Sequence, residues 1–152
     1  MAESAAVEAS IDRATVADLN RLLAEHRRYW GDRDLRHLHL AALVHEFGET
    51  CLVVRDGDGL AAYLLGFVTP ARVGYIHAVA ARDDARGRGL GRRLYAAFTA
   101  AAGAQGATTL KAITSPANTG SIAFHRALGF DASVVEDYNG PGRPMVVFTR
   151  VL

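Results

Sequence analysis

Three glycines and four arginines stand close together in one short stretch of the chain. The stretch is DARGRGLGRRLY, residues 84–95, with glycine at positions 87, 89 and 91. It follows a strand-like apolar run and precedes a run with helical spacing, so we expect it to form the first turn of a helix. Backbone N–H groups in such a turn have no helical partner, and the helix dipole makes this end positive. Glycine lets an anion approach these groups, and arginine adds forked donors. A phosphate or pyrophosphate is therefore the expected ligand.

The spacing excludes two common phosphate-binding motifs. A Walker loop ends in Gly-Lys-Ser/Thr, whereas Gly91 is followed by Arg92 and Arg93. A dinucleotide fingerprint needs G-x-G-x-x-G, but its last position would hold Arg92 or Leu94, depending on which glycine begins the count. A glycine-rich turn with solvated arginines stays open here as the alternative.

Length, composition and charge limit the class of protein. The chain has 152 residues, half of them hydrophobic, and a formal net charge of +1. We therefore expect one domain with a core and no surface built for nucleic acid. No apolar run reaches the roughly 18 residues of a membrane span, and residues 1–14 show no secretory signal. The one cysteine, Cys51, lies in an apolar run and is expected to be a buried thiol, which favours the cytoplasm.

Apolar periodicity and turn residues predict a succession of strands and helices. The expected strands cover residues 10–15, 50–55, 60–69, 73–81, 108–114, 132–137 and 145–152. The expected helices cover residues 16–30, 34–48, 89–104 and 118–130, with Thr15 and Asn118 as N-caps. The DGDG segment, residues 56–59, predicts a hairpin. This order predicts an α/β (α+β) fold, in which a mixed sheet is covered by helices on its faces.

Two distant motifs resemble those of one enzyme superfamily. ARGRGLG is similar to the Arg/Gln-x-x-Gly-x-Gly/Ala signature of the GNAT acyltransferases, with Arg86, Gly89 and Gly91 in the defining positions. NTGSIAFHRALGF, residues 118–130, resembles a later helix motif of the same superfamily. The predicted order of strands and helices is similar to that fold as well. The resemblance implies a mixed, mostly antiparallel sheet of about seven strands covered by about four helices, in a single domain over residues 1–152.

The resemblance implies transfer of an acetyl group from acetyl-CoA to a primary amine of a small molecule or peptide, without a covalent enzyme intermediate. The strand before the glycine loop would pair with the pantetheine arm, and the loop would hold the pyrophosphate. The implied coenzyme-binding residues are Val79, Ala80, Ala81, Arg86, Gly87, Arg88, Gly89, Leu90, Gly91, Arg92, Asn118 and His125. No metal is expected, because the histidines at 37, 39 and 45 lack the spacing of a zinc-binding pair.

Three residues are candidates for catalysis under this resemblance. His125 stands where the superfamily usually has the tyrosine that protonates the leaving thiolate, so it is either a substitute acid or a packing residue. His77 occupies a position where some members carry a catalytic histidine, and it is the candidate base. The Val79 N–H is the candidate oxyanion stabiliser. Strand alternation would put Tyr75, His77, Val79 and Ala81 on one face.

The acceptor site is less well defined by the sequence. Loops that overhang it in the fold supply Tyr29, Trp30 and Tyr138, and the strand supplies Tyr75. Acidic residues in the same loops, at positions 32, 34, 136 and 137, would suit a cationic amine. Two alternatives stay open, namely a regulatory module that binds acyl-CoA without turnover and an acyltransferase with another acyl donor. We expect no nucleic-acid or membrane partner, and a homodimer is open because strand-mediated dimers are frequent in the superfamily.

Overall fold

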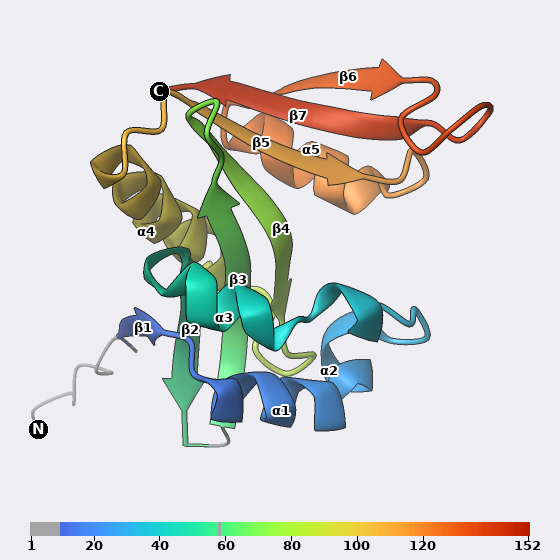
Figure 1. Ribbon diagram of the computed structural model, residues 1–152. Coiled ribbons are helices and arrows are strands. Elements are labelled where there is room, and N and C mark those ends of the chain that lie inside the picture. The colour runs from blue at the N-terminus through green and yellow to red at the C-terminus, as the bar shows by residue number, and fades with distance from the viewer. Residues whose placement is uncertain (1–9, 58) are drawn as a thin grey trace, which may run out of the picture.

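A single sheet organises the computed structural model, which describes residues 10–57 and 59–152. Within these residues, seven strands follow the order β1-β2-β3-β4-β5-β7-β6 (Figure 1). The strands are β1 (Ile11–Arg13), β2 (Cys51–Asp56), β3 (Gly59–Val68), β4 (Val73–Ala81), β5 (Thr109–Thr114), β6 (Asp131–Val135) and β7 (Met145–Val151). Neighbouring strands are antiparallel, except that β4 and β5 are parallel. The predicted mixed, mostly antiparallel sheet is confirmed.

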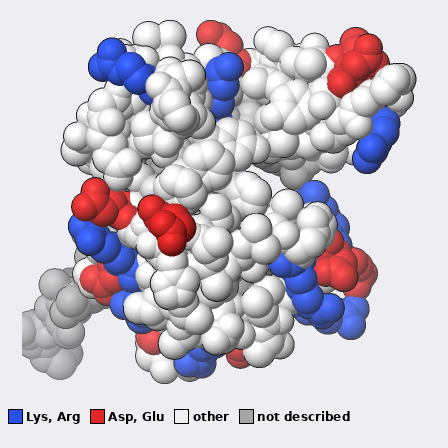
Figure 2. Space-filling view, in the orientation of Figure 1, with Lys and Arg blue, Asp and Glu red and all other residues white. Residues whose placement is uncertain are grey.

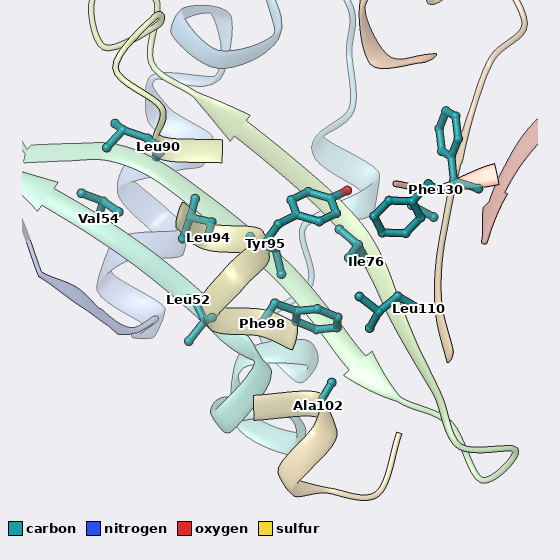
Figure 3. Packing of buried hydrophobic residues seen from close by; sticks show 14 of the residues in the cluster. Leu52, Val54, Ile76, Leu90, Leu94, Tyr95, Phe98, Ala102, Leu110 and Phe130 are labelled. Carbon is teal, nitrogen blue, oxygen red and sulfur yellow. The ribbon is translucent and has the colours of Figure 1, made fainter. Parts of the chain in front are cut away.

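Helices cover both faces of this sheet. In the described part of the chain they are α1 (Val16–Ala24), α2 (His26–Trp30), α3 (Ala41–Glu46), α4 (Leu90–Ala104) and α5 (Thr119–Ala127), with one-turn 3-10 helices η1 (Arg36–Leu38) and η2 (Gly48–Thr50). One buried cluster joins α1, α2 and α3 to one face, and a second joins α4 and α5 to the other. In Figure 3, Leu94 and Phe98 of α4 lie in this second cluster with Leu52 and Ile76 of the sheet.

Several local predictions are confirmed. Thr15 caps α1 through a capping box with Asp18, and Asn118 caps α5 by accepting from the Ser121 N–H at 3.1 Å. β2 and β3 form the expected hairpin, although its turn residue Asp58 lies outside the described residues. Residues 1–9, on which the prediction about a secretory signal depends, also lie outside them.

Two predicted helices are wrong in extent. The helix expected over residues 16–30 is divided into α1 and α2, and the helix expected over residues 34–48 is reduced to η1 and the six-residue α3. Side chains bond to the backbone in this segment. The His39 Nδ1 lies 2.7 Å from the Leu35 carbonyl oxygen, and the Leu35 N–H donates to His26 Nε2 at 3.2 Å. Such bonds compete with the regular bonds of a helix.

Strand β4 contains a β-bulge at His77. Across the β3–β4 ladder, Leu65 pairs with Ala78 and Gly66 pairs with Ile76. His77 is therefore the extra residue on β4. An extra residue shifts the side-chain alternation of a strand, so the two halves of β4 are out of phase.

The bulge separates residues that the sequence places on one face. Tyr75 and His77 make ring contacts with Phe67 on the face that carries α1–α3. Val79 and Ala81 pack against the cluster on the α4 face instead. The prediction that Tyr75, His77, Val79 and Ala81 share a face is wrong, because it assumed unbroken alternation along the strand.

Gly66, next to the bulge, offers a test of this packing. A Cβ there would lie 2.6 Å from Phe98 Cε2 and 2.7 Å from the Tyr75 carbonyl oxygen. Since the backbone oxygen has no room to move, we expect Gly66→Ala to lower the free energy of unfolding by about 1–3 kcal/mol. Gly103 of α4 faces open space, and Gly103→Ala should raise that free energy by about 1 kcal/mol through helix propensity. Urea unfolding of both variants checks the pair, and equal stability of the two would contradict the packing at the bulge.

Candidate active site

The sheet opens where β4 and β5 stop pairing. The two strands share four pairs, from Val73 with Thr109 to Ile76 with Ala112, and then diverge (Figure 1). A cleft of about 920 Å³ lies at the divergence. Its walls come from β4, the end of β5, the first turns of α4 and α5, and the segment around η1. In Figure 2 the surface is hollowed between the part formed by β5, β6 and β7 and the part below it that carries α2 and α3.

The diverging half of β4 presents backbone groups to this cleft. The Arg82 N–H, just beyond the strand, donates to the Ala61 carbonyl of β3 at 2.8 Å. Backbone polar groups alternate between the two edges of a strand, so those of Val79 and Ala81 point to the opposite edge, toward the cleft. Val79, Ala80 and Ala81 all line it. An extended polar ligand can therefore pair with this edge as another strand would.

The glycine loop follows directly and leads into α4. Gly87 and Gly89 have φ values of 79° and 71°, the left-handed conformation that glycine adopts without strain. Gly89 is the N-cap of α4, and its carbonyl accepts from the Arg93 N–H at 3.1 Å. The N–H groups of Leu90 and Gly91 thus precede the first helical bond and can bind an anion. Gly91 lines the cleft, and a Cβ on it would lie 3.3 Å from Phe124 Cζ.

The arginines of the loop do not act as one group. Arg86 lines the cleft, and its guanidinium donates to the Tyr29 carbonyl at 3.2 Å. The Arg88 side chain bends back to the Asp84 carbonyl at 3.2 Å. Arg92 is exposed on the first turn of α4. The loop therefore keeps a positive field around its N–H groups while two of its arginines also hold the local backbone.

His125, on α5, is buried in the wall of the cleft and has both ring nitrogens engaged. Its Nδ1 lies 2.7 Å from the Ser121 carbonyl oxygen, so Nδ1 carries the proton and donates. Nε2 then accepts from the Tyr95 hydroxyl at 2.5 Å. The ring stacks on Phe148 with a centroid distance of 3.9 Å. Burial lowers the pKa of His125 and raises that of Tyr95, so both groups are neutral at pH 7.

His77 lines the cleft from the bulge of β4. Its Nε2 lies 2.8 Å from the Leu38 carbonyl oxygen, which can only accept, so Nε2–H donates. The lone pair of the neutral ring is therefore on Nδ1. A bulge places one residue outside the ladder, and here that residue is a histidine with a defined tautomer beside the open edge of β4.

Only two of the four residues predicted to bind the acceptor line the cleft. Trp30 and Tyr75 line the cleft. Tyr29 lies in the core, where its hydroxyl donates to the Leu60 carbonyl at 2.6 Å, and burial raises its pKa to about 12. Tyr138 is 44% exposed in the β6–β7 loop and is not part of the cleft wall. Asn118 does line the cleft beside its cap.

Sequence reasoning missed several residues of the cleft. Tyr95 lies one helical turn beyond Gly91 and lines the cleft together with it, a relation that the i, i+4 spacing could have indicated. His37 and Leu38 line the opposite wall from the segment that was predicted as a regular helix, and Arg33 lines it from the turn just before that segment. Among the described residues, no group of three or more potential ligands could hold a metal ion. None of the helices in that part of the chain is long and apolar enough to cross a membrane.

A family comparison agrees with this geometry. The model of the acetyltransferase (GNAT) family matches residues 16–130, which include the bulged strand, the glycine loop and α5. The chain belongs to this family. The resemblance inferred from the two sequence motifs is thereby confirmed.

Individual GNAT relatives show how far the likeness extends. The L-methionine sulfoximine/L-methionine sulfone acetyltransferases of Pseudomonas paraeruginosa and Pseudomonas aeruginosa are 46% identical to the chain over 57 residues, 38% of this chain and 33% of each relative. The match thus spans about a third of the length of these curated relatives.

Solved structures with low identity share the fold. Ard1 from Thermoplasma volcanium superposes with a TM-score of 0.81 at 16% identity, covering 96% of this chain and 99% of that one. A phosphinothricin acetyltransferase from Sinorhizobium meliloti, solved in complex with AcCoA, gives 0.71 at 20% identity, covering 95% and 88%.

Proposed function

We propose that this GNAT protein is an acetyl-CoA-dependent N-acetyltransferase that acts directly on a primary amine of a small molecule or peptide. The observation that carries the proposal is one cleft in which the free edge of β4 meets the amides of the glycine loop. Family membership and a GNAT relative solved with AcCoA support the same ligand. Cys51 is fully buried and burial raises its pKa, so it is a structural thiol and not a nucleophile.

The residues of the cleft fit coenzyme A. The edge groups of Val79 and Ala81 would pair with the amides of the pantetheine arm. The N–H groups around Gly89 and Gly91 would bind the pyrophosphate, with the neighbouring arginines supplying charge. The side-chain NH2 group of Asn118 is also available at the cleft, since the helix cap uses only the side-chain oxygen. When bound, acetyl-CoA supplies an acetyl group on a thioester.

The pyrophosphate site can be tested by introducing a negative charge into it. Gly91→Glu places a carboxylate among the loop amides, where it is compatible with the helix dipole but repels a phosphate. We expect the Kd for acetyl-CoA to rise roughly 10- to 100-fold. This increase corresponds to the loss of one hydrogen bond between a loop N–H and the charged pyrophosphate. Gly103→Glu makes the same change at an open position of the same helix and should leave Kd unaltered. Calorimetric titration measures both, and equal affinities would place the coenzyme elsewhere.

His77 is the proposed general base. The attacking amine must lose a proton, and the lone pair on His77 Nδ1 is available for it, directly or through a water. The Val79 N–H points to the same open edge and is proposed to stabilise the negative charge that develops on the carbonyl oxygen. His77 and Val79 lie two residues apart on β4, and the bulge that moves the His77 imidazole to one face leaves the Val79 amide facing the cleft.

A His77→Ala variant tests the role of the base. We expect kcat/KM to fall by about 10²- to 10⁴-fold at pH 7, and the acidic limb of the pH–rate profile to disappear. The exposed His45 of α3 provides the control, since His45→Ala removes the same group outside the cleft. An acidic limb that persists in His77→Ala would assign the base to another residue.

The role of His125 is modified by its contacts. The neutral His125 ring has one N–H, which donates to the Ser121 carbonyl oxygen, so the ring has no proton to donate toward the cleft. We propose that His125 positions the Tyr95 hydroxyl, and that this hydroxyl turns its single proton from His125 Nε2 to the sulfur as charge develops there. The raised pKa of Tyr95 favours hydrogen-bond donation over complete proton transfer.

Removal of the Tyr95 hydroxyl separates this role from packing. Tyr95→Phe should lower kcat by roughly 10- to 100-fold with little change in the KM for acetyl-CoA, since the lost bond is to a developing charge. Tyr29→Phe removes a buried hydroxyl outside the cleft and serves as the control. Steady-state kinetics compares the two. If Tyr95→Phe keeps the parent kcat, Tyr95 and His125 only fill the core.

Release of free thiol from acetyl-CoA with a panel of amines tests the whole proposal. A regulatory module would bind acetyl-CoA without releasing thiol, and longer acyl-CoA donors would reveal another acyl preference. The single domain over residues 1–152, the cytoplasmic location, the absence of nucleic-acid and membrane partners, and the homodimer stay predictions. The buried free thiol of Cys51 supports the cytoplasm, and sedimentation would determine the oligomeric state.

A further inference from the structure

The charged groups that face the cleft have one sign. Arg33 and Arg86 line it, and both are positively charged. Among the described residues, no aspartate or glutamate lies in its wall. The acidic loop residues that the sequence offered for a cationic acceptor are therefore not where a cation would bind. An acceptor with several ammonium groups finds no counter-charge in this cleft.

The carboxylates nearest Arg33 in sequence are paired with other arginines. Asp32 accepts from Arg27 at 2.6 Å, and Asp34 lies 3.9 Å from Arg36. No carboxylate within the described ranges lies within ion-pair distance of Arg33 itself. Its guanidinium carbon lies 5.8 Å from the centroid of the Trp30 ring. Arg33 thus presents a guanidinium to the cleft whose forked donors are free for an anion.

The Trp30 ring beneath Arg33 is held by a buried chain of hydrogen bonds. The indole N–H donates to the Tyr63 hydroxyl oxygen at 2.6 Å. The Tyr63 hydroxyl donates to His39 Nε2 at 2.8 Å, because His39 Nδ1–H donates to the Leu35 carbonyl at 2.7 Å. Burial lowers the pKa of His39 and keeps its ring neutral, as this chain requires. Tyr63 is 1% exposed on β3, so the platform for Arg33 is fixed to the sheet.

The segment that carries Arg33 also reaches the proposed base. The Leu38 carbonyl accepts from His77 Nε2 at 2.8 Å, and both residues line the cleft. The cation and the base therefore lie on the wall opposite α5, on the face of the sheet that carries α1–α3. The glycine loop, which would hold the coenzyme phosphates, leads into α4 on the other face.

We propose that the acceptor is an amino acid or amino acid analogue, whose free carboxylate binds Arg33 while its amine faces His77. This inference rests on the proposed acetyltransferase function and narrows its substrate class. Polyamines and aminoglycosides lack a carboxylate. The N-terminal residue of a peptide lacks one too, because its carboxyl group forms the first peptide bond.

Matched acceptors test the carboxylate directly. Leucine, methionine and phenylalanine are each offered as the free acid, the amide and the decarboxylated amine, and thiol release gives kcat/KM. We expect each free acid to exceed its amide and amine by roughly 10- to 100-fold. Arg33→Gln should remove this preference by raising the KM for the acid only, with the KM for acetyl-CoA unaltered. Arg36→Gln, at an exposed arginine outside the cleft wall, should keep the preference.

Three outcomes would overturn the proposal while leaving acetyl transfer intact. The first is equal use of acids, amides and amines. The second is an Arg33→Gln variant that keeps the preference for the acid. The third is an Arg33→Gln variant whose KM rises for acetyl-CoA, which would assign Arg33 to the coenzyme.

Binding distinguishes failure of the substrate class from failure of the proposed function. Calorimetry of the three free acids and their amides with the CoA-loaded protein needs no turnover. Arg33-dependent binding of an acid without thiol release would support the carboxylate site and contradict the acetyltransferase. If no free acid binds and none is acetylated, the carboxylate site is refuted.

Discussion

The cleft exists because β4 stops pairing with β5 after four residues. Ile76 and Ala112 form the last pair, and the bulge at His77 follows at once. The bulge gives β4 added local twist and leaves its second half with one unpaired edge. That edge carries the Val79 amide, and the residue pushed out of the ladder is the histidine proposed as base. The bulge therefore lies at the opening and places the His77 imidazole beside the free backbone edge.

The far end of the same strand is fixed by a buried charge. Arg82 has 1% of its side chain exposed and forms ion pairs with Asp56 at 2.5 Å and with Asp84. An unpaired buried guanidinium is strongly destabilising, so both carboxylates are required where they are. Asp56 ends β2, and Arg28 of α2 bonds Asp83 at 3.0 Å. The turn into the glycine loop is thus held from two sides, so its amides are oriented before a ligand arrives.

The sequence predicts those parts of the site that depend on local chemistry. The glycines of the loop and the Asn118 cap need particular backbone conformations, and the residue types reveal them. The bulge was not predictable, because it depends on how β4 pairs with a strand distant in the chain. The irregular segment 34–48 was missed for a related reason: its apolar spacing is helical, but His39 bonds its backbone and the buried Tyr63. The partnership of Tyr95 with His125 likewise requires two helices to meet.

The sign of charge in the cleft affects chemistry as well as binding. An ammonium beside Arg33 and Arg86 is disfavoured relative to the neutral amine, because like charges lower its pKa. The neutral amine is the nucleophile, so a wall without carboxylates moves the acceptor toward its reactive form. The same wall would repel an acceptor whose only charge is its ammonium. A carboxylate paired with Arg33 offsets that repulsion, so one end of an amino acid provides affinity while the other is deprotonated. Binding of the acceptor and deprotonation of its amine are then favoured by the same positive charge. A cleft lined with acidic residues would bind the ammonium but would also stabilise its protonated form.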